Sequence, residues 1–100
     1  MCNYAIESWN SMPSESLTII NKLGLHARAA AKLAEQANRY ACQIELTAND
    51  QTVDCKSIMS LMLLAASQGT PIQLHTQGSD EDLAMAAITN LINDYFGEGE

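Results

Sequence analysis

The chain has 100 residues, a length that suits one domain with one hydrophobic core. Its formal net charge of −7 at pH 7 favours solubility and argues against a general affinity for nucleic acid or anionic lipid. No apolar stretch approaches the roughly 20 residues that a membrane span needs, and residues 1–14 do not resemble a secretory signal. We therefore expect a cytoplasmic monomer with an irregular leader at 1–14 and one folded domain at 15–100.

The first half of the chain predicts a strand, a helix and a hairpin of two strands. Gly24 ends the first, β-branched segment, and Asn49-Asp50 is a favoured tight-turn pair between the two later strands. The helix is rich in alanine, and its small apolar face implies close packing on a sheet. That face comprises Ala30, Leu33, Ala34, Ala37 and Ala41. The predicted segments are a strand at 15–21, a helix at 27–39, and strands at 42–48 and 51–55.

The second half predicts a helix, a strand and a last helix. Ser57 is placed to cap the first of these helices and Ser79 the second, and Gly69 follows the end of the first. The predicted segments are a helix at 57–67, a strand at 71–77, a helix from 80 to about 96 and a fraying tail at 97–100. The expected core faces are Ile58, Leu61, Met62 and Ala65 in the first helix, and Leu83, Ala87, Leu91 and Tyr95, with Ala84, Ile88 and Ile92 beside them, in the second.

The element order is β-α-β-β-α-β-α. This order indicates an α+β fold, an open-faced sandwich of two layers. We expect a four-stranded, mainly antiparallel sheet with three helices on one face.

The basic residues are distributed unevenly. Lys22, Arg28 and Lys32 lie around His26, whereas residues 80–100 hold six acidic residues and no basic one. An acidic molecule that gathers its cations around one histidine is expected to meet an anion there. The alternative is that the lysines are merely solvated and their grouping is accidental.

The cysteines predict neither a disulfide framework nor a metal site. Cys2, Cys42 and Cys55 are an odd number without paired short spacing, and the two histidines are far apart in sequence. Buried, reduced thiols are the expectation, with no metal and no cofactor.

His26 stands where a strand and a glycine give way to a helix. The first amides of a helix lack internal acceptors and its positive dipole end favours anions, so the amides of Ala27 and Arg28 could receive phosphoryl oxygens. The Arg28 guanidinium could pair with another oxygen, and a neutral imidazole can attack phosphorus directly. No aspartate accompanies the histidine, which favours a phosphate carrier over a hydrolase. The alternative is a histidine that only caps the helix.

The segment LGLHARAAAKLA resembles the active-site stretch of the histidine-containing phosphocarrier protein, HPr, of the bacterial phosphotransferase system. That family has a Gly-Leu-His-x-Arg-Pro-Ala run at the start of its first helix. The resemblance continues through CKSIMSLMLLAASQGTPI and covers residues 15–96. The segment Asn21-Lys22-Leu23-Gly24 is most similar to the nitrogen-related branch of the family, NPr.

The resemblance implies that His26 is the phosphoacceptor, through its Nδ1 atom, and that Arg28 stabilises the phosphoryl group. The donor would be an enzyme I-type kinase charged by phosphoenolpyruvate, and the acceptor an A-type domain of an enzyme II. Such a protein is a carrier with a phosphohistidine intermediate rather than a turnover enzyme. Ala29 stands where the motif has proline, a change that loosens the free chain by about 1 kcal/mol or less. We expect the anion site to survive this change.

The remaining candidates concern regulation and docking. Ser57 is expected to cap its helix, and in some bacteria the matching serine of HPr is phosphorylated by a dedicated kinase. The predicted partner surface comprises Leu25, Lys32, Lys56, Ile58, Met59 and Met62. Alternatively, Ile58 and Met62 fill the core. The alternative functions are a regulatory binding module, switched by phosphorylation at His26 or Ser57, and an inert α/β domain. His75 is expected to be simply exposed.

Overall fold

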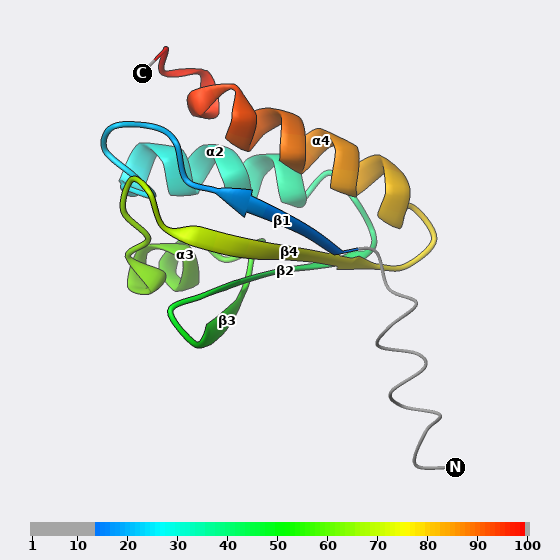
Figure 1. The fold of residues 1–100 in the computed structure, drawn as a ribbon. Helices are drawn as coiled ribbons and strands as arrows, with labels where there is room; N and C mark the ends of the chain where they lie inside the picture. The colour runs from blue at the N-terminus through cyan, green and yellow to red at the C-terminus, as the bar shows by residue number, and fades with distance from the viewer. Residues whose placement is uncertain (1–13, 100) are drawn as a thin grey trace.

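The computed structural model describes residues 14–99, which form strands and helices in the predicted order (Figure 1). The strands are β1 (Ser14–Thr18), β2 (Gln43–Ala48), β3 (Gln51–Asp54) and β4 (Pro71–Gln77). The helices are α2 (Ala27–Ala37), α3 (Ile58–Leu64) and α4 (Glu81–Asn93), followed by a 3-10 turn, η1 (Tyr95–Gly97). The strands pair antiparallel in the order β1-β4-β2-β3, so the predicted fold is confirmed. The proposed leader lies outside the described residues, except Ser14, where β1 begins.

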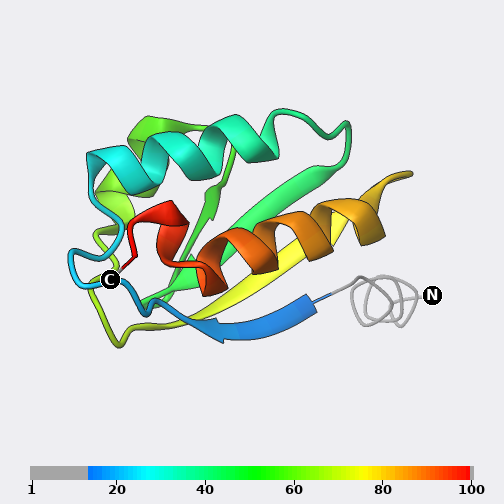
Figure 2. The same cartoon turned by 90° about the horizontal axis from the view of Figure 1, so that it is seen from above.

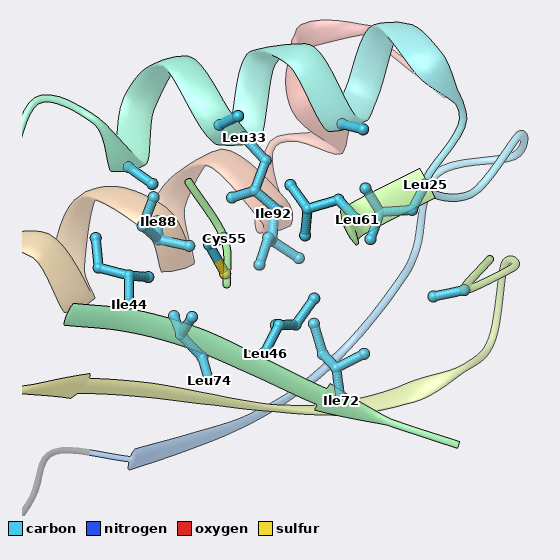
Figure 3. Packing of buried hydrophobic residues seen from close by; sticks show 14 of the residues in the cluster. Leu25, Leu33, Ile44, Leu46, Cys55, Leu61, Ile72, Leu74, Ile88 and Ile92 are labelled. Carbon is cyan, nitrogen blue, oxygen red and sulfur yellow. The ribbon is translucent and has the colours of Figure 1, made fainter. Parts of the chain in front are cut away.

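The sheet has one buried and one polar face because β2 and β4 alternate in residue type. Leu46 faces Leu74 across the β2–β4 pair, and both are fully buried. Helices α2 and α4 lie side by side across this apolar face, whereas α3 contacts α2 and β3 (Figures 1 and 2). Figure 3 shows the isoleucine and leucine side chains that fill the space between the helices and the sheet.

Helix α2 packs closely because its buried face is made almost wholly of alanine. Leu33 is the one large residue on that face, and Ala29 of the altered motif is also completely buried. The prediction that Ala41 belongs to this face is wrong. The helix ends at Ala37, and Asn38 is its C-cap residue. The Asn38 side-chain amide donates to the Ala34 carbonyl over 2.8 Å. Ala41 is therefore exposed.

Helix α4 buries a different face from the predicted one. The buried residues are Ala84, Ile88 and Ile92, and the buried Phe96 continues their spacing of four. Leu83, expected in the core, is 68% exposed. The two candidate faces differ by one residue, about 100° around the helix, and both are apolar. The small Ala84 lets the helix approach the sheet, and the two isoleucines then fill the core.

The hairpin turn and the cap of α3 follow the predictions. Asn49 and Asp50 connect β2 to β3 with φ of 52° and 64°, the left-handed geometry that fits strand twist. Ser57 caps α3, and its hydroxyl accepts from the Ser60 amide over 3.2 Å. The end of that helix differs from the prediction, because Ala65 adopts the left-handed conformation four residues before Gly69.

The prediction that Ser79 caps the last helix is wrong. Asp80 occupies the cap position, and its carboxylate accepts from the Ala41 and Cys42 amides over 2.9 and 3.0 Å. The hydrogen bond from the Ala41 amide is the main reason that the pKa of Asp80 lies below its ordinary value. Asp80 therefore ties the start of α4 to the entry of β2.

The two described cysteines are free and buried, as predicted, whereas Cys2 lies outside the described residues. Burial raises the pKa of the Cys42 thiol to about 11 and raises that of Cys55 as well. Within residues 14–99, no three metal-ligating side chains are gathered as an ion would require. No helix in that same part of the chain has the length and apolar character to cross a bilayer.

Candidate functional site

A tight turn before α2 fixes the backbone that leads to His26. The Gly24 amide donates to the Asn21 carbonyl over 3.1 Å, and Gly24 has a φ of +69°. A Cβ at Gly24 would lie 2.6 Å from the carbonyl oxygen of Ala66, so only glycine fits there. The next amide, of Leu25, donates to that same carbonyl over 2.8 Å. The loop before the helix is therefore held against the segment that follows α3.

Leu25 does not belong to the surface, contrary to the prediction. Its side chain is 4% exposed and points into the core beside Leu61 (Figure 3). The anchored backbone at Leu25 turns this side chain inward and leaves the next one, His26, at the surface.

His26 is the N-cap of α2, with extended backbone angles of −76° and 178°. Its carbonyl accepts from the Ala30 amide over 2.8 Å, and its Nδ1 atom accepts from the Arg28 amide over a longer 3.3 Å. The side chain is 27% exposed. The histidine thus caps the helix, as one prediction held, and also presents the Nδ1 lone pair to the amides of the first turn.

The three cations predicted to gather around His26 do so. Lys22, Arg28 and Lys32 line the same hollow of about 780 Å³ as His26, together with the exposed Ala27. Positive side chains and the positive end of a helix therefore surround one imidazole, an arrangement that attracts anions.

Lys56, predicted to belong to the partner surface, lies elsewhere. Its Nζ atom donates to the Tyr40 carbonyl over 2.8 Å, and its own carbonyl accepts from Asn38 over 3.1 Å. Both contacts lie at the C-terminal end of α2, whereas His26 lies at its N-terminal end. Because α2 has 11 residues, the two ends are about 16 Å apart. Lys56 and the neighbouring Ser57 are therefore remote from the hollow around His26.

Within the predicted fraying tail at 97–100, Gly97 and Glu98 are held against the domain, contrary to the prediction, and Glu100 lies outside the described residues. Residues 95–98, here called the C-terminal strap, fold back beside the loop that precedes α2 (Figure 2). Phe96 anchors the strap in the core, and its carbonyl accepts from Lys32 Nζ over 2.9 Å. Gly97 permits the return with a φ of 77°. The strap therefore forms one wall of the hollow.

Glu98, at the end of the strap, binds the imidazole directly. Its Oε2 atom is hydrogen-bonded to His26 Nε2, and its Oε1 atom accepts from Asn21 Nδ2 over 2.9 Å. Burial raises the pKa of this carboxyl, but hydrogen bonds from Asn21 and His26, with the nearby charge of Lys32, outweigh burial. The pKa of Glu98 therefore lies below its ordinary value, and the group is a carboxylate at neutral pH.

Apolar side chains are exposed on the α3 side of the site. Met62, at 44% exposure, and Leu23, at 69%, line a second hollow that His26 and Ala27 share. The other large apolar residues exposed on α3 are Ile58, Met59 and Leu63. The alternative that Ile58 and Met62 fill the core is therefore wrong, and sequence reasoning did not single out Leu23 or Leu63. His75 is partly buried on β4, so its predicted simple exposure is also wrong.

Sequence reasoning also missed Asn21 and Glu98. Asn21 is completely buried, and its Nδ2 atom donates to the Gly24 carbonyl over 2.8 Å as well as to Glu98. Two signals were available for Glu98. An acidic C-terminal segment faces a basic cluster in a two-layer fold, and glycines on both sides of Glu98 allow the chain to turn back.

Comparison with known proteins identifies a family for this chain. The family model described as "PTS HPr component phosphorylation site" matches residues 13–94. The chain is 55% identical over 89 residues to phosphocarrier protein HPr of Neisseria meningitidis, and the match covers 89% of this chain and 100% of that protein. It is 56% identical over 90 residues to HPr of Pseudomonas aeruginosa, with the same coverage.

A solved structure has the same fold. The crystal structure of HPr-C-His from Thermoanaerobacter tengcongensis superposes with a TM-score of 0.84 at 40% identity, covering 87% of this chain and 98% of that one. These relatives carry the name HPr, and the similarity of residues 21–24 to the nitrogen-related branch remains a prediction.

Proposed function

The chain belongs to the HPr family of the phosphotransferase system, and from this premise we propose that His26 carries a phosphoryl group between two proteins. The donor is an enzyme I-type kinase charged by phosphoenolpyruvate. The acceptor is an A-type domain of an enzyme II. The chain is a carrier in this proposal, because the phosphoryl group is transferred to another protein and not to water.

The observation that carries the proposal is the direction of the His26 ring. Nδ1 faces the Arg28 amide at the start of α2, while Nε2 is engaged by Glu98 on the other side. An unprotonated imidazole nitrogen is a nucleophile, and the Arg28 amide that now bonds Nδ1 over 3.3 Å lies where it can receive an oxygen of the group that Nδ1 attacks.

The transfer needs only positioning and charge. The Nδ1 lone pair forms the new bond to phosphorus, and the old bond to the donor breaks with its electron pair remaining on the donor. The amides of Ala27 and Arg28 receive phosphoryl oxygens, and the Arg28 guanidinium, exposed at the rim, pairs with another. Onward transfer reverses these steps, with the electron pair returning to Nδ1.

The exposed apolar residues beside the site suit the docking of both partners. Met62 and Leu23 border His26, and Met59, with 69% exposure, continues this surface along α3. Flexible methionine side chains adapt to different partner surfaces, which a carrier with a donor and an acceptor needs. Lys32 contributes from the rim of the hollow, whereas Leu25 contributes only to the core and Lys56 lies at the remote end of α2.

The test is phosphorylation with a purified enzyme I-type kinase and phosphoenolpyruvate, followed by intact-mass measurement. The expected result is a mass gain of one phosphate that acid removes, as phosphoramidate bonds to histidine are acid-labile. His26→Ala should abolish the gain, whereas the matched variant His75→Ala should retain it. A folded wild-type chain that gains no phosphate, or a His26→Ala variant that still gains it, would contradict the proposal.

A further inference from the structure

We propose that Glu98, held by Asn21, is a positioning residue that keeps the proton of His26 on Nε2 and so makes Nδ1 the nitrogen that accepts the phosphoryl group. This inference rests on the proposed function, because it assigns the geometry of the same transfer. Glu98 lies beyond residues 13–94, the segment matched by the family model, so its assignment comes from the contacts of this chain.

Two contacts on opposite sides of the ring specify the same tautomer. The Glu98 carboxylate has only acceptor atoms at neutral pH, so in the bond between Oε2 and Nε2 the proton belongs to Nε2. The Arg28 amide is a donor, so Nδ1 must offer its lone pair in that contact. A ring flip would break both hydrogen bonds, and the other tautomer would set an N–H against an N–H.

The carboxylate is itself fixed from several directions. Asn21 is completely buried, and its amide bridges Glu98 Oε1 and the Gly24 carbonyl over 2.9 and 2.8 Å. The Glu98 side chain is only 11% exposed. Phe96 anchors the strap, and Lys32 binds its carbonyl. Glu98 is therefore part of a supported network, unlike a surface carboxylate that meets a histidine by chance.

The network also supports the charge that develops during the transfer. When Nδ1 bonds to phosphorus, the proton stays on Nε2 and the ring becomes a cation. The Glu98 carboxylate faces that proton and stabilises the cationic ring. When the phosphoryl group leaves, its bonding pair returns to Nδ1 and the ring is neutral again. Neither direction requires a proton to enter or leave the site.

The charged groups that line the hollow are Lys22, Arg28, Lys32 and Glu98. Lys32 lies on the strap side, where its Nζ atom binds the Phe96 carbonyl and its charge acts on Glu98. Arg28 begins α2 beside Nδ1, and Glu98 binds the opposite nitrogen. Glu98 is therefore the described carboxylate placed to hold the ring proton, and it does not compete with phosphate for Nδ1.

The first test uses the unphosphorylated protein, so it does not depend on transfer. In ¹⁵N-labelled wild type, NMR should find the ring proton on Nε2 with slow exchange into water. Glu98→Ala should increase this exchange rate about tenfold or more, because a charge-assisted hydrogen bond is lost. The control Glu35→Gln removes the same charge from an exposed site on α2 and should leave the rate unchanged. Equal rates in wild type and Glu98→Ala would overturn the inference.

The second test uses the phosphorylated protein. The rate of phosphoryl loss is measured as a function of pH. The rate that is seen in acid should persist to higher pH in wild type, and in Glu98→Gln the fall of the rate with rising pH should begin about one pH unit lower. If the role of Glu98 were merely structural, the rate would fall at the same pH in the variant as in wild type. The control Glu35→Gln should show this unchanged profile. Coincident profiles, or phosphate found on Nε2, would overturn the inference.

The two failures are distinguishable. If a folded chain with a protected Nε2 proton takes no phosphate at all, the proposed function is wrong, and the role of Glu98 in transfer falls with it. If the chain is phosphorylated on Nδ1 but Glu98→Ala changes neither ring-proton exchange nor the pH profile, only the role of Glu98 is wrong.

Discussion

Two helix starts in this molecule carry a side chain that could accept a phosphoryl group. His26 caps α2 and Ser57 caps α3, and each accepts from an amide of its first turn, over 3.3 and 3.2 Å. Their surroundings differ. Ser57 is fixed by neighbours in sequence, since its amide donates to the Asp54 carbonyl over 3.1 Å. His26 also binds the C-terminal strap, whose Glu98 is 72 positions away and is held by Asn21 of the preceding turn.

The different surroundings of His26 and Ser57 show that an N-cap position alone does not make a phosphoryl-transfer site. A capped helix start satisfies its own amides, and the hydrogen bonds that Ser57 makes join it to its neighbours in sequence. At α2 the fold adds Lys22, Arg28 and Lys32, and it adds a carboxylate on the far ring nitrogen. The charged groups gathered around the imidazole, rather than the cap alone, distinguish a candidate site from a structural helix end.

The largest expected effect is the loss of delivery to the acceptor. His26→Ala should abolish transfer from a charged enzyme I-type kinase to an A-type domain, because the nucleophile is gone. Ser57→Ala should transfer at the wild-type rate. The measurement is the phosphate that reaches the acceptor. Equal loss in both variants would break the distinction between the two helix starts.

Removing the guanidinium beside His26 should give the next largest effect. Arg28→Gln should slow phosphorylation about 100-fold, since one charged partner of the phosphoryl oxygens is lost. Arg39→Gln is the matched control, because Arg39 is exposed and its ion pair with Glu35 is a long 3.9 Å. Rates are measured by rapid quench. An effect of similar size in both variants would point to net charge rather than to the site.

The turn before His26 should be sensitive to a single methyl group. Gly24→Ala should lower the free energy of unfolding by about 3 kcal/mol, because the new Cβ would meet the Ala66 carbonyl and the backbone has a positive φ. Gly69→Ala is a matched control, with a φ of +90° but no atom within 4 Å of the new Cβ, and should cost about 1 kcal/mol. Denaturant unfolding measures both values. Equal costs would mean that the Gly24 contact can relax.

The serine cap should matter for stability and not for transfer. Ser57→Ala should lower the free energy of unfolding by about 1 kcal/mol, because the Ser60 amide loses its acceptor. Thermal and denaturant unfolding measure this cost. Transfer that falls together with stability would show that the start of α3 takes part in the reaction.

The smallest effect concerns acid. The pKa of Glu98 is lower in the folded chain than its ordinary value of 4.5, so its contacts stabilise the fold fully above that value. This stability is lost as the pH falls below 4.5 and through the folded pKa. Glu98→Gln should therefore show a shallower loss of stability in this range, measured by unfolding at a series of pH values. An unchanged slope would show that the folded carboxylate is no better bound than the unfolded one.

The sequence was sufficient for those features that depend on local patterns. Alternation in β2 and β4, the Asn49-Asp50 turn and the Ser57 cap were all predictable, because each follows from a residue and its near neighbours. The grouping of cations around His26 was predictable for the same reason, since the residues concerned lie close together in the chain.

The features that failed depend on tertiary packing. Helix α4 had two adjacent apolar faces, and only the sheet decides that Ala84 rather than Leu83 faces inward. Leu25 was predicted to be exposed, but its amide pairs with Ala66, 41 positions away, and that pairing turns its side chain inward. Glu98 was missed because its partners lie more than 70 residues away. Long-range contacts of this kind have no periodic signature in a single sequence.

The most direct measurement is the location of the phosphate after the chain has been incubated with an enzyme I-type kinase and phosphoenolpyruvate. NMR of ¹⁵N-labelled protein identifies both the residue and the ring nitrogen. The account predicts one phosphate, bonded to Nδ1 of His26, with the proton still on Nε2. Phosphate on any other residue, or none on a correctly folded chain, would contradict it.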